Sequence, residues 1–302
     1  MNKLQAMEVF VQVVDAGGFT RAAENMRLPK ATVSTLVQAL ERTLSAKLLN
    51  RTTRHVSVTA EGADYYERCI RVLSQIRDAE DALAHNRLNP TGRLRIDVAT
   101  WLASEVIVPA LPAFLAMYPE IQLEIGCGDR PVDLVEEGVD CAIRGGRQLA
   151  DSRLIARRIG TVRYRTCASP AYLERHGRPL HPSELTQHQC INYFSARTGQ
   201  IFDWYFARES ERIQVTLSSP VALNDSSAYT VAGVAGLGIV QMAEILMTPM
   251  ILDSRLIPVL EEWTNDPLPI YVVYPQNRHL SAKLRVFVEW VTQLFAAHPD
   301  LH

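Results

Sequence analysis

The sequence predicts a mixed fold in three parts: a small helical head, one long helix and a larger α/β domain. Three observations predict it. Helical apolar stripes fill the first 49 residues, residues 60–88 contain neither proline nor glycine after Gly62, and strand patterns alternate with helix patterns beyond Gly92. A chain of 302 residues is long enough for two or three such domains.

Charge is distributed unevenly between the head and the rest of the chain. Residues 1–60 carry eight Lys or Arg and four acids, so their net charge is +4, whereas the remainder carries −6. A basic head on an acidic body favours contact of the head alone with a polyanion.

Composition and cysteine usage indicate the cellular compartment of the protein. The amino terminus has no basic segment followed by an apolar run, and no stretch is expected to reach the length of a membrane span. The five cysteines are scattered without ligand spacing, so they are expected to be reduced and mostly buried. We therefore expect a cytoplasmic protein with no membrane partner, no metal site and no cofactor.

The head begins with two short helices. Residues 4–14 place four apolar side chains on one stripe, and Gly17 and Gly18 end this helix. Thr20 offers an N-cap for a second helix that runs to Met26, and Pro29 suits the start of a third. The pattern is helix, short turn, helix.

The third helix, about residues 30–43, has two distinct faces. Its core stripe consists of Val33, Leu36, Val37, Leu40 and Leu44. The opposite face carries Lys30, Ala31, Ser34, Thr35 and Gln38. These side chains are short or hydrogen-bonding and none is acidic, which suits a helix in a DNA major groove. An ordinary solvated face is the alternative.

A small β-ribbon is predicted after the third helix. The basic turn 50–55 precedes the alternating run 56–59. Two arginines and two threonines at a ribbon tip can contact phosphates and a minor groove, although a basic turn alone is usually only solvated.

The long helix, from Ala60 to about Leu88, carries a narrow apolar seam at heptad positions: Tyr66, Cys69, Leu73, Ile76 and Leu83. Such a seam fits a partner helix, and the alternative is a helix packed on its own chain. The run 89–92, with Pro90 and Gly92, then breaks the chain and marks a domain boundary.

The remaining residues alternate strands and helices, which argues for parallel-rich sheets. We expect strands at 94–98, 121–125, 140–144 and 270–274, an apolar helix at 102–117, a short helix at 133–137 and a last amphipathic helix near 284–295.

Several blocks with preserved spacing make the head resemble that of LysR-type transcriptional regulators: residues 19–23, 28–34, 40–41, 48–54 and 58–62. The resemblance implies a winged helix-turn-helix that binds double-stranded promoter DNA. Thr35 stands where many members have arginine, and Ser45 where a glycine is usual. The expected DNA-contacting residues are Thr20, Arg21, Lys30, Ala31, Thr32, Ser34, Thr35, Gln38, Arg51, Thr53 and Arg54.

The resemblance extends over the α/β part through residues 132–144, 168–173, 235–239, 274–275 and 278–281. It implies a periplasmic-binding-protein-like effector domain of two subdomains with a small-molecule effector between them, and a homodimer through the linker helix that pairs into a homotetramer. The expected organisation is a DNA-binding domain at 1–60, a linker or dimerisation helix at 61–89 and an effector-binding domain at 92–302. Subdomain I covers about 92–162 and 268–302, and subdomain II about 163–267.

The effector site is expected at the carboxyl ends of strands and at the helix starts that follow them. The candidate residues are Thr100, Trp101, Ser104, Cys127, Arg144, Asn224 and Asp225. Helix starts and Arg144 suit an anionic metabolite and Trp101 suits an aromatic one. Arg144 can instead bridge subdomains, and Asp225 can be only a helix cap.

An enzyme is the chief rival class, and no catalytic residue is expected. The glycines of 233–238 are in the wrong order and context for a dinucleotide loop, and no Walker loop, HExxH, CxxC or nucleophile elbow is present. A transport binding protein and a purely structural DNA-binding protein are disfavoured, the first by the head and the second by the large α/β domain.

Overall fold

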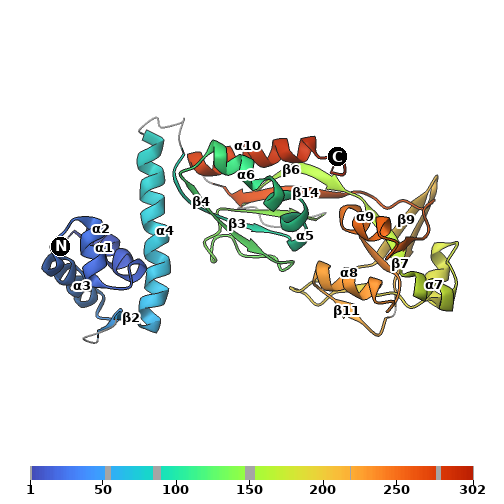
Figure 1. The fold of residues 1–302 in the computed structure, drawn as a ribbon, viewed down its shortest axis with the longest axis horizontal. Helices are drawn as coiled ribbons and strands as arrows, with labels where there is room; N and C mark the ends of the chain where they lie inside the picture. Colours follow the sequence, from blue (N-terminus) through green and yellow to red (C-terminus); the bar gives the residue numbers. More distant parts are fainter. Residues whose placement is uncertain are drawn as a thin grey trace. The chain divides into compact units, whose positions relative to one another are not determined.

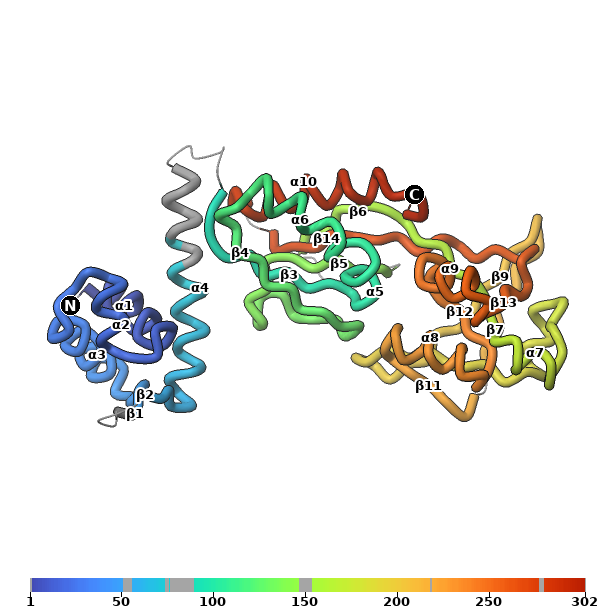
Figure 2. The backbone as a smooth tube through the Cα atoms, viewed as in Figure 1, coloured from blue at the N-terminus to red at the C-terminus, as the bar shows by residue number. Residues whose placement is uncertain are grey.

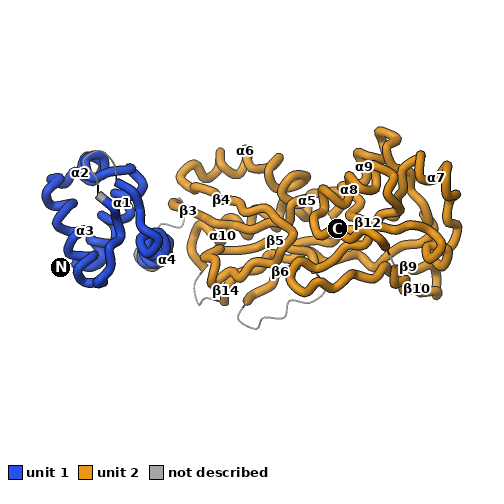
Figure 3. The backbone as a smooth tube through the Cα atoms, turned by 90° about the horizontal axis from the view of Figure 1, so that it is seen from below, with its two compact units in different colours: residues 1–86 blue, residues 87–302 orange. Residues whose placement is uncertain are grey.

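The computed structural model describes residues 2–51, 56–83, 90–146, 154–217, 219–276 and 280–301. The chain forms two compact units, residues 1–86 and 87–302, which Figure 3 colours separately. Each unit has its own hydrophobic core.

Unit 1 contains three short helices, a two-stranded ribbon and one long helix (Figure 1). The elements are α1 (Lys3–Asp15), α2 (Phe19–Met26), α3 (Lys30–Leu44), β1 (Leu49–Arg51), β2 (Val56–Val58) and α4 (Ala60–Leu83). The strands β1 and β2 pair antiparallel, as the alternating run predicts. Helices α1, α2 and α3 pack on one another and α4 packs on α1.

The first part of the apolar seam of α4 packs on its own chain, the alternative considered from the sequence. Cys69 and Leu73 are buried in the core of unit 1, with Tyr66 packed against them. The ring of Phe10, on α1, contacts Tyr66 edge-on with centroids 6.5 Å apart. Because α1 covers these residues, any pairing of chains through α4 must use other residues of the helix.

Unit 2 is built around a five-stranded sheet with the strand order β4-β3-β5-β14-β6. The strands are β3 (Gly92–Val98), β4 (Ile121–Cys127), β5 (Cys141–Gly145), β6 (Leu154–Val162) and β14 (Leu268–Pro275). Only β4, β3 and β5 run parallel, because β14 pairs antiparallel with both of its neighbours. The expectation of parallel-rich sheets is therefore correct for half of this sheet.

Helices α6 (Val108–Met117) and α10 (Ala282–Ala297) lie side by side along this sheet (Figure 2). The Phe114 ring meets Phe287 edge-on at 5.7 Å and Trp290 at 4.9 Å between centroids. This aromatic cluster stabilises the layer because each ring buries a large apolar area and adds edge-to-face attraction.

The helical run before α6 is irregular. It begins as α5 (Thr100–Leu102), continues as a π-helical turn (Ala103–Ile107) and then becomes α6. By length and composition alone, Thr100–Met117 could cross a bilayer, which corrects the expectation that no stretch is long enough. Leu102, Ile107 and Phe114 are fully buried in the core of unit 2, however, which is typical of the core helix of a folded domain.

The second half of unit 2 starts where β6 ends at Val162 and β7 begins at Tyr164. Its central sheet is antiparallel, with the order β12-β7-β13. The elements are β7 (Tyr164–Ala168), α7 (Pro170–His176), a 3-10 helix (Pro182–Gln187), β8 (Asn192–Tyr193), β9 (Trp204–Arg208), β10 (Glu211–Val215), β11 (Ala222–Leu223), α8 (Ser226–Val234), β12 (Val240–Ala243), α9 (Glu244–Leu252) and β13 (Ile257–Pro258). The chain returns to the five-stranded sheet at β14.

Some expected features differ in the structure. The segment 133–137 is a turn rather than a helix: the Asp133 carboxylate accepts from the backbone N–H groups of Val135 and Glu136 as a cap does, but the segment closes only one turn, with the Glu137 N–H donating to the Asp133 carbonyl at 2.9 Å. Four of the five cysteines are buried and all five are free, as expected; Cys127 alone is exposed.

Candidate DNA interface and effector junction

Helix α3 presents a polar face because its apolar residues are used in the core. Val33, Val37 and Leu40 are fully buried, and their spacing puts all three on one side of the helix. The other side is open to solvent. Its exposed residues are Lys30, Ala31, Thr32, Thr35 and Gln38, and Ser34 beside them is half-buried.

The exposed face of α3 is basic and hydrogen-bonding in character. No acid lies in the first turn, and Lys30 is at the start of the helix. The Thr35 hydroxyl donates its proton to the Ala31 carbonyl at 2.9 Å. Toward a DNA base it can therefore act only as a hydrogen-bond acceptor. This face can enter a major groove without bringing a carboxylate near phosphate.

Thr20 and Arg21 are exposed in the first turn of α2, next to the turn that leads into α3. The helix begins one residue earlier than expected, with Gly18 at the cap position and no side-chain cap, so Thr20 does not cap it. Arg51 ends β1, whereas Thr53 and Arg54 lie outside the described residues.

Glu41, on α3, fixes the start of the ribbon. Its carboxylate accepts from the backbone N–H groups of Leu48 at 2.9 Å and Leu49 at 3.1 Å. The first strand of the ribbon is thereby tied to the helix that is expected to read bases. Sequence reasoning did not identify this role, because the spacing of seven and eight residues matches no local capping pattern.

In unit 2, four elements from both halves meet at the Asp129 carboxylate, which follows β4. Its Oδ1 accepts from the backbone N–H of Thr100 at 3.2 Å. Its Oδ2 accepts from the backbone N–H of Ser226 at 2.7 Å and lies 2.9 Å from the Tyr193 hydroxyl. We call these four residues the Asp129 junction. Thr100 and Ser226 begin α5 and α8, and α5 packs against α8.

Burial and charge act together on Tyr193 at this junction. Burial, followed by the negative charge of Asp129, raises the pKa of the Tyr193 phenol, so the hydroxyl keeps its proton and can donate it. The Asn224 carbonyl oxygen lies 3.1 Å from the same hydroxyl. One proton is therefore shared between the two acceptors.

Arg144, at the end of β5, holds the loop that carries Asp129. Its guanidinium donates to the Gly128 carbonyl and, at 3.1 Å, to the Arg130 carbonyl, the two neighbours of Asp129. It also forms an ion pair with the buried carboxylate of Asp97. Burial raises the pKa of Asp97 more than the Arg144 charge lowers it. These contacts hold the Arg144 guanidinium against the loop 128–130.

The other expected effector residues are not all at the Asp129 junction. Trp101 is only 8% exposed and belongs to the core, and Ser104 bonds to the Trp101 carbonyl and to Glu105. Cys127 is exposed at the end of β4. Asp225 caps α8 by accepting from the Ala228 N–H at 2.8 Å, the alternative role considered from the sequence.

Two junction residues, Asp129 and Tyr193, were missed from the sequence. Asp129 follows the second strand closely, so the argument from strand ends could have found it. Tyr193 lies in a two-residue strand, which is too short for any periodicity to reveal.

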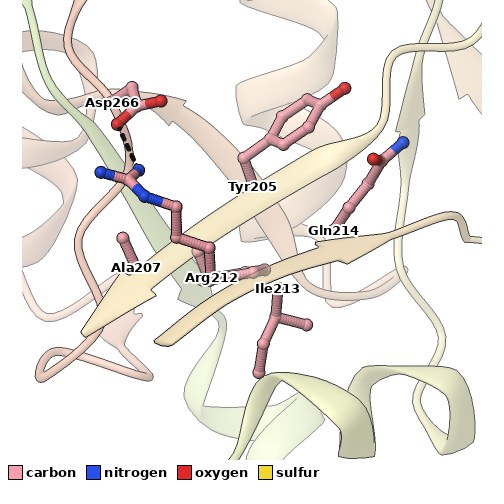
Figure 4. A pocket seen from close by; sticks show the side chains of 7 residues that line it. Tyr205, Ala207, Arg212, Ile213, Gln214 and Asp266 are labelled. Carbon is pink, nitrogen blue, oxygen red and sulfur yellow. Dashed lines mark hydrogen bonds and ion pairs between the residues drawn. The ribbon is translucent and has the colours of Figure 1, made fainter. Parts of the chain in front are cut away.

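A shallow pocket lies elsewhere, on the β9–β10 hairpin (Figure 4). Its volume is about 240 Å³, and its lining includes Tyr205, Arg212 and Asp266. Arg212 pairs with Asp266 at 3.0 Å, which satisfies both charges across the pocket. No expected effector residue lines it.

Both units match known protein families. Residues 4–63 match the family described as bacterial regulatory helix-turn-helix protein, lysR family, and residues 88–296 match the LysR substrate binding domain. Over 301 residues, the chain is 41% identical to an HTH-type transcriptional repressor of Pseudomonas aeruginosa, covering all of this chain and 95% of that one.

Solved structures of full-length regulators are also similar. CrgA of Neisseria meningitidis is 34% identical with a TM-score of 0.60, covering 96% of this chain and 97% of that one. The Vibrio cholerae virulence activator AphB is 30% identical with a TM-score of 0.60, covering 96% and 98%. The similarity thus extends over both units.

Proposed function

Because this chain belongs to the LysR family of DNA-binding transcriptional regulators, we propose that it reads its operator with the exposed face of α3 and responds to a small anionic effector. Regulators of this family oligomerise and pair a DNA-binding head with an effector-binding domain. The protein is a regulator and not an enzyme. We place it in the cytoplasm, with its DNA.

The observation that carries the DNA part is the acid-free face of α3. Lys30, Thr35 and Gln38 are exposed along it while the apolar side is buried. Amide and hydroxyl side chains discriminate bases, and a lysine adds attraction to phosphate. The basic head and the acidic remainder direct DNA to this unit.

The Asp129 junction supports an anionic rather than an aromatic effector. The backbone N–H groups of Thr100 and Ser226 converge there with the Tyr193 hydroxyl, and all three donate to a carboxylate. Trp101 lies in the core, so the aromatic alternative loses the side chain that suggested it. Thr100 and Asn224 remain candidate effector contacts, and Arg144 is proposed to position the loop beside them.

We also propose that the chain forms homodimers through an outward face of α4 and that two dimers pair into a homotetramer. Val72 is 41% exposed on this helix, whereas Cys69 and Leu73 are buried against α1. An apolar side chain on the outward side of α4 offers a second chain a contact that leaves the packing on α1 undisturbed.

The DNA proposal is tested by placing a carboxylate on the α3 face. In Gln38→Glu, repulsion from phosphate and loss of an amide donor should weaken binding to the protein's own upstream DNA by about tenfold or more. The matched control is Gln122→Glu, which makes the same charge change at an exposed position on β4.

Fluorescence anisotropy with labelled DNA measures both variants beside the wild type, with melting temperatures to show that all three are folded. Equal affinities for the two variants would remove α3 from the DNA interface.

A further inference from the structure

We propose that Glu41 is a positioning residue for DNA binding: its carboxylate orients the ribbon β1–β2 against α3, so that helix and ribbon meet one DNA duplex together. This inference deepens the proposed function and rests on it. It follows from how one oxygen binds the ribbon, from how the other end of the ribbon is fixed, and from the sign of the Glu41 charge.

One oxygen of Glu41 takes two successive backbone N–H groups of the ribbon. Oε1 accepts from Leu48 at 2.9 Å and from Leu49 at 3.1 Å. Successive N–H groups point in opposite directions along a strand, so a single acceptor can bind both only where the chain bends. The Glu41 carboxylate therefore sets the point at which the chain turns into β1, which begins at Leu49.

Apolar packing beneath these bonds does not fix a direction by itself. Leu48 and Leu49 are buried in the core of unit 1 together with Val37 of α3. Apolar contact is non-directional, whereas a hydrogen bond weakens steeply as its angle departs from linear. The two bonds to Glu41 therefore add the orientation that the packing leaves open.

The other end of the ribbon is fixed to α4 by Thr59. The Thr59 N–H donates to the Leu48 carbonyl at 3.0 Å. Its hydroxyl donates to the Lys47 carbonyl at 2.6 Å and accepts from the Gly62 N–H at 2.9 Å. The base of the ribbon is thus held from two sides, by α3 through Glu41 and by α4 through Thr59. Without the Glu41 carboxylate, the ribbon stays attached to α4 but can turn away from α3.

The orientation of the ribbon matters because α3 and the ribbon are expected to contact neighbouring parts of one duplex. Arg51, which ends β1, is one of the expected DNA-contacting residues. A ribbon that is already oriented loses little conformational entropy on binding, whereas a loose ribbon must be ordered at the expense of affinity. Removal of the Glu41 carboxylate should therefore weaken binding and reduce the number of phosphates that the head neutralises.

The charge of Glu41 alone predicts the opposite effect. A carboxylate in a DNA-binding head repels phosphate, so its removal should strengthen binding if Glu41 had no positioning role. Glu24 provides the comparison, since it is an exposed acid of the same head on α2. The direction of the change in affinity therefore separates positioning from electrostatics.

The test is titration of full-length Glu41→Ala, Glu41→Gln and Glu24→Ala onto the protein's own upstream DNA in a salt series. Glu41→Ala should bind about fivefold to tenfold more weakly than the wild type. Its slope of log K against log salt should be shallower by about 1, because about one phosphate contact is lost. Glu41→Gln keeps an accepting oxygen and should retain the wild-type slope. Glu24→Ala should bind at least as tightly as the wild type.

A double-mutant cycle shows whether Glu41 acts through the ribbon. Arg51→Ala should weaken binding in the wild type and weaken it less in the Glu41→Ala background. Val13→Ala, which opens a cavity in the core of the head, is the control for lost stability: it should lower the melting temperature without changing the slope. Should Glu41→Ala fail to fold, Glu41→Met fills the same space without an acceptor and must show the same shallower slope.

The positioning role is overturned if Glu41→Ala binds as tightly as Glu24→Ala, if its slope stays at the wild-type value, or if Arg51→Ala affects both backgrounds equally. Gln38→Glu separates this outcome from failure of the proposed function. Unchanged binding of Glu41→Ala with weakened binding of Gln38→Glu rejects the positioning role alone. Equal affinities of Gln38→Glu and Gln122→Glu reject α3 as the reading helix, whatever Glu41→Ala does.

Discussion

Ser45 ends α3 with its backbone in the left-handed region, at a φ of +52°. A Cβ atom crowds the backbone in this region, which is why glycine is the usual residue at such a helix end. The sequence already marked Ser45 as a departure from a common glycine. The residue adopts the glycine conformation without being glycine, so this helix end carries avoidable strain.

Ser45→Gly should therefore raise the free energy of unfolding by about 0.5–1 kcal/mol, since relief of the left-handed strain exceeds the extra entropy of the unfolded chain. Urea denaturation followed by circular dichroism measures it. Ser57→Gly is the control, because Ser57 lies in the middle of β2, where glycine is unfavourable. Equal or opposite changes for the two variants would contradict this account of Ser45.

At the scale of elements, the sequence predicted those with long, regular patterns. The three head helices, the ribbon and α10 are found where the periodicity indicated. The π-helical turn at Ala103–Ile107 and the two-residue strands were not predicted, because an apolar run has the same pattern in either helix type and two residues have no period. A heptad pattern does not say which surface covers it, so the packing of Cys69 and Leu73 on α1 could not be predicted from the seam of α4.

The ribbon packs so closely against the start of α4 that position 62 has no room for a side chain and requires glycine. A Cβ at this position would lie 2.0 Å from the Leu48 carbonyl oxygen and 2.9 Å from the Val58 side chain. Gly62→Ala should lower the free energy of unfolding by about 1–3 kcal/mol, because the backbone must shift to admit the methyl group. Gly18→Ala, with open space around its Cβ, is the control. Chemical denaturation that shows equal stability losses would refute the packing argument.

A substitution at Val72 tests whether two chains pair through α4. Val72→Glu places a charge on its exposed side and should lower the mass measured by light scattering at a fixed protein concentration, because a buried charge without a partner opposes association. Val135→Glu, an equal change at a 56% exposed position on a turn of unit 2, should leave the mass unchanged. An unchanged mass for Val72→Glu would direct the search to another surface.

At the scale of the whole molecule, function was easier to predict from the sequence than the effector site. The head could be identified because its blocks keep their spacing within 65 consecutive residues. The Asp129 junction includes a hydrogen bond between residues 97 positions apart, and its hydrogen bonds depend on packing of the two halves of unit 2. Arg144 was correctly placed at a strand end, but its partners Asp97, Gly128 and Arg130 could come only from the structure.

The central claim is sequence-specific DNA binding, and it is tested most directly by titrating the full-length protein onto its own upstream DNA in a salt series, with scrambled DNA as competitor. The account predicts saturable binding that weakens as salt rises, because counterions are released from phosphate, yet survives the competitor. Equal binding to both DNAs at every salt concentration, or no binding by folded protein at low salt, would contradict it.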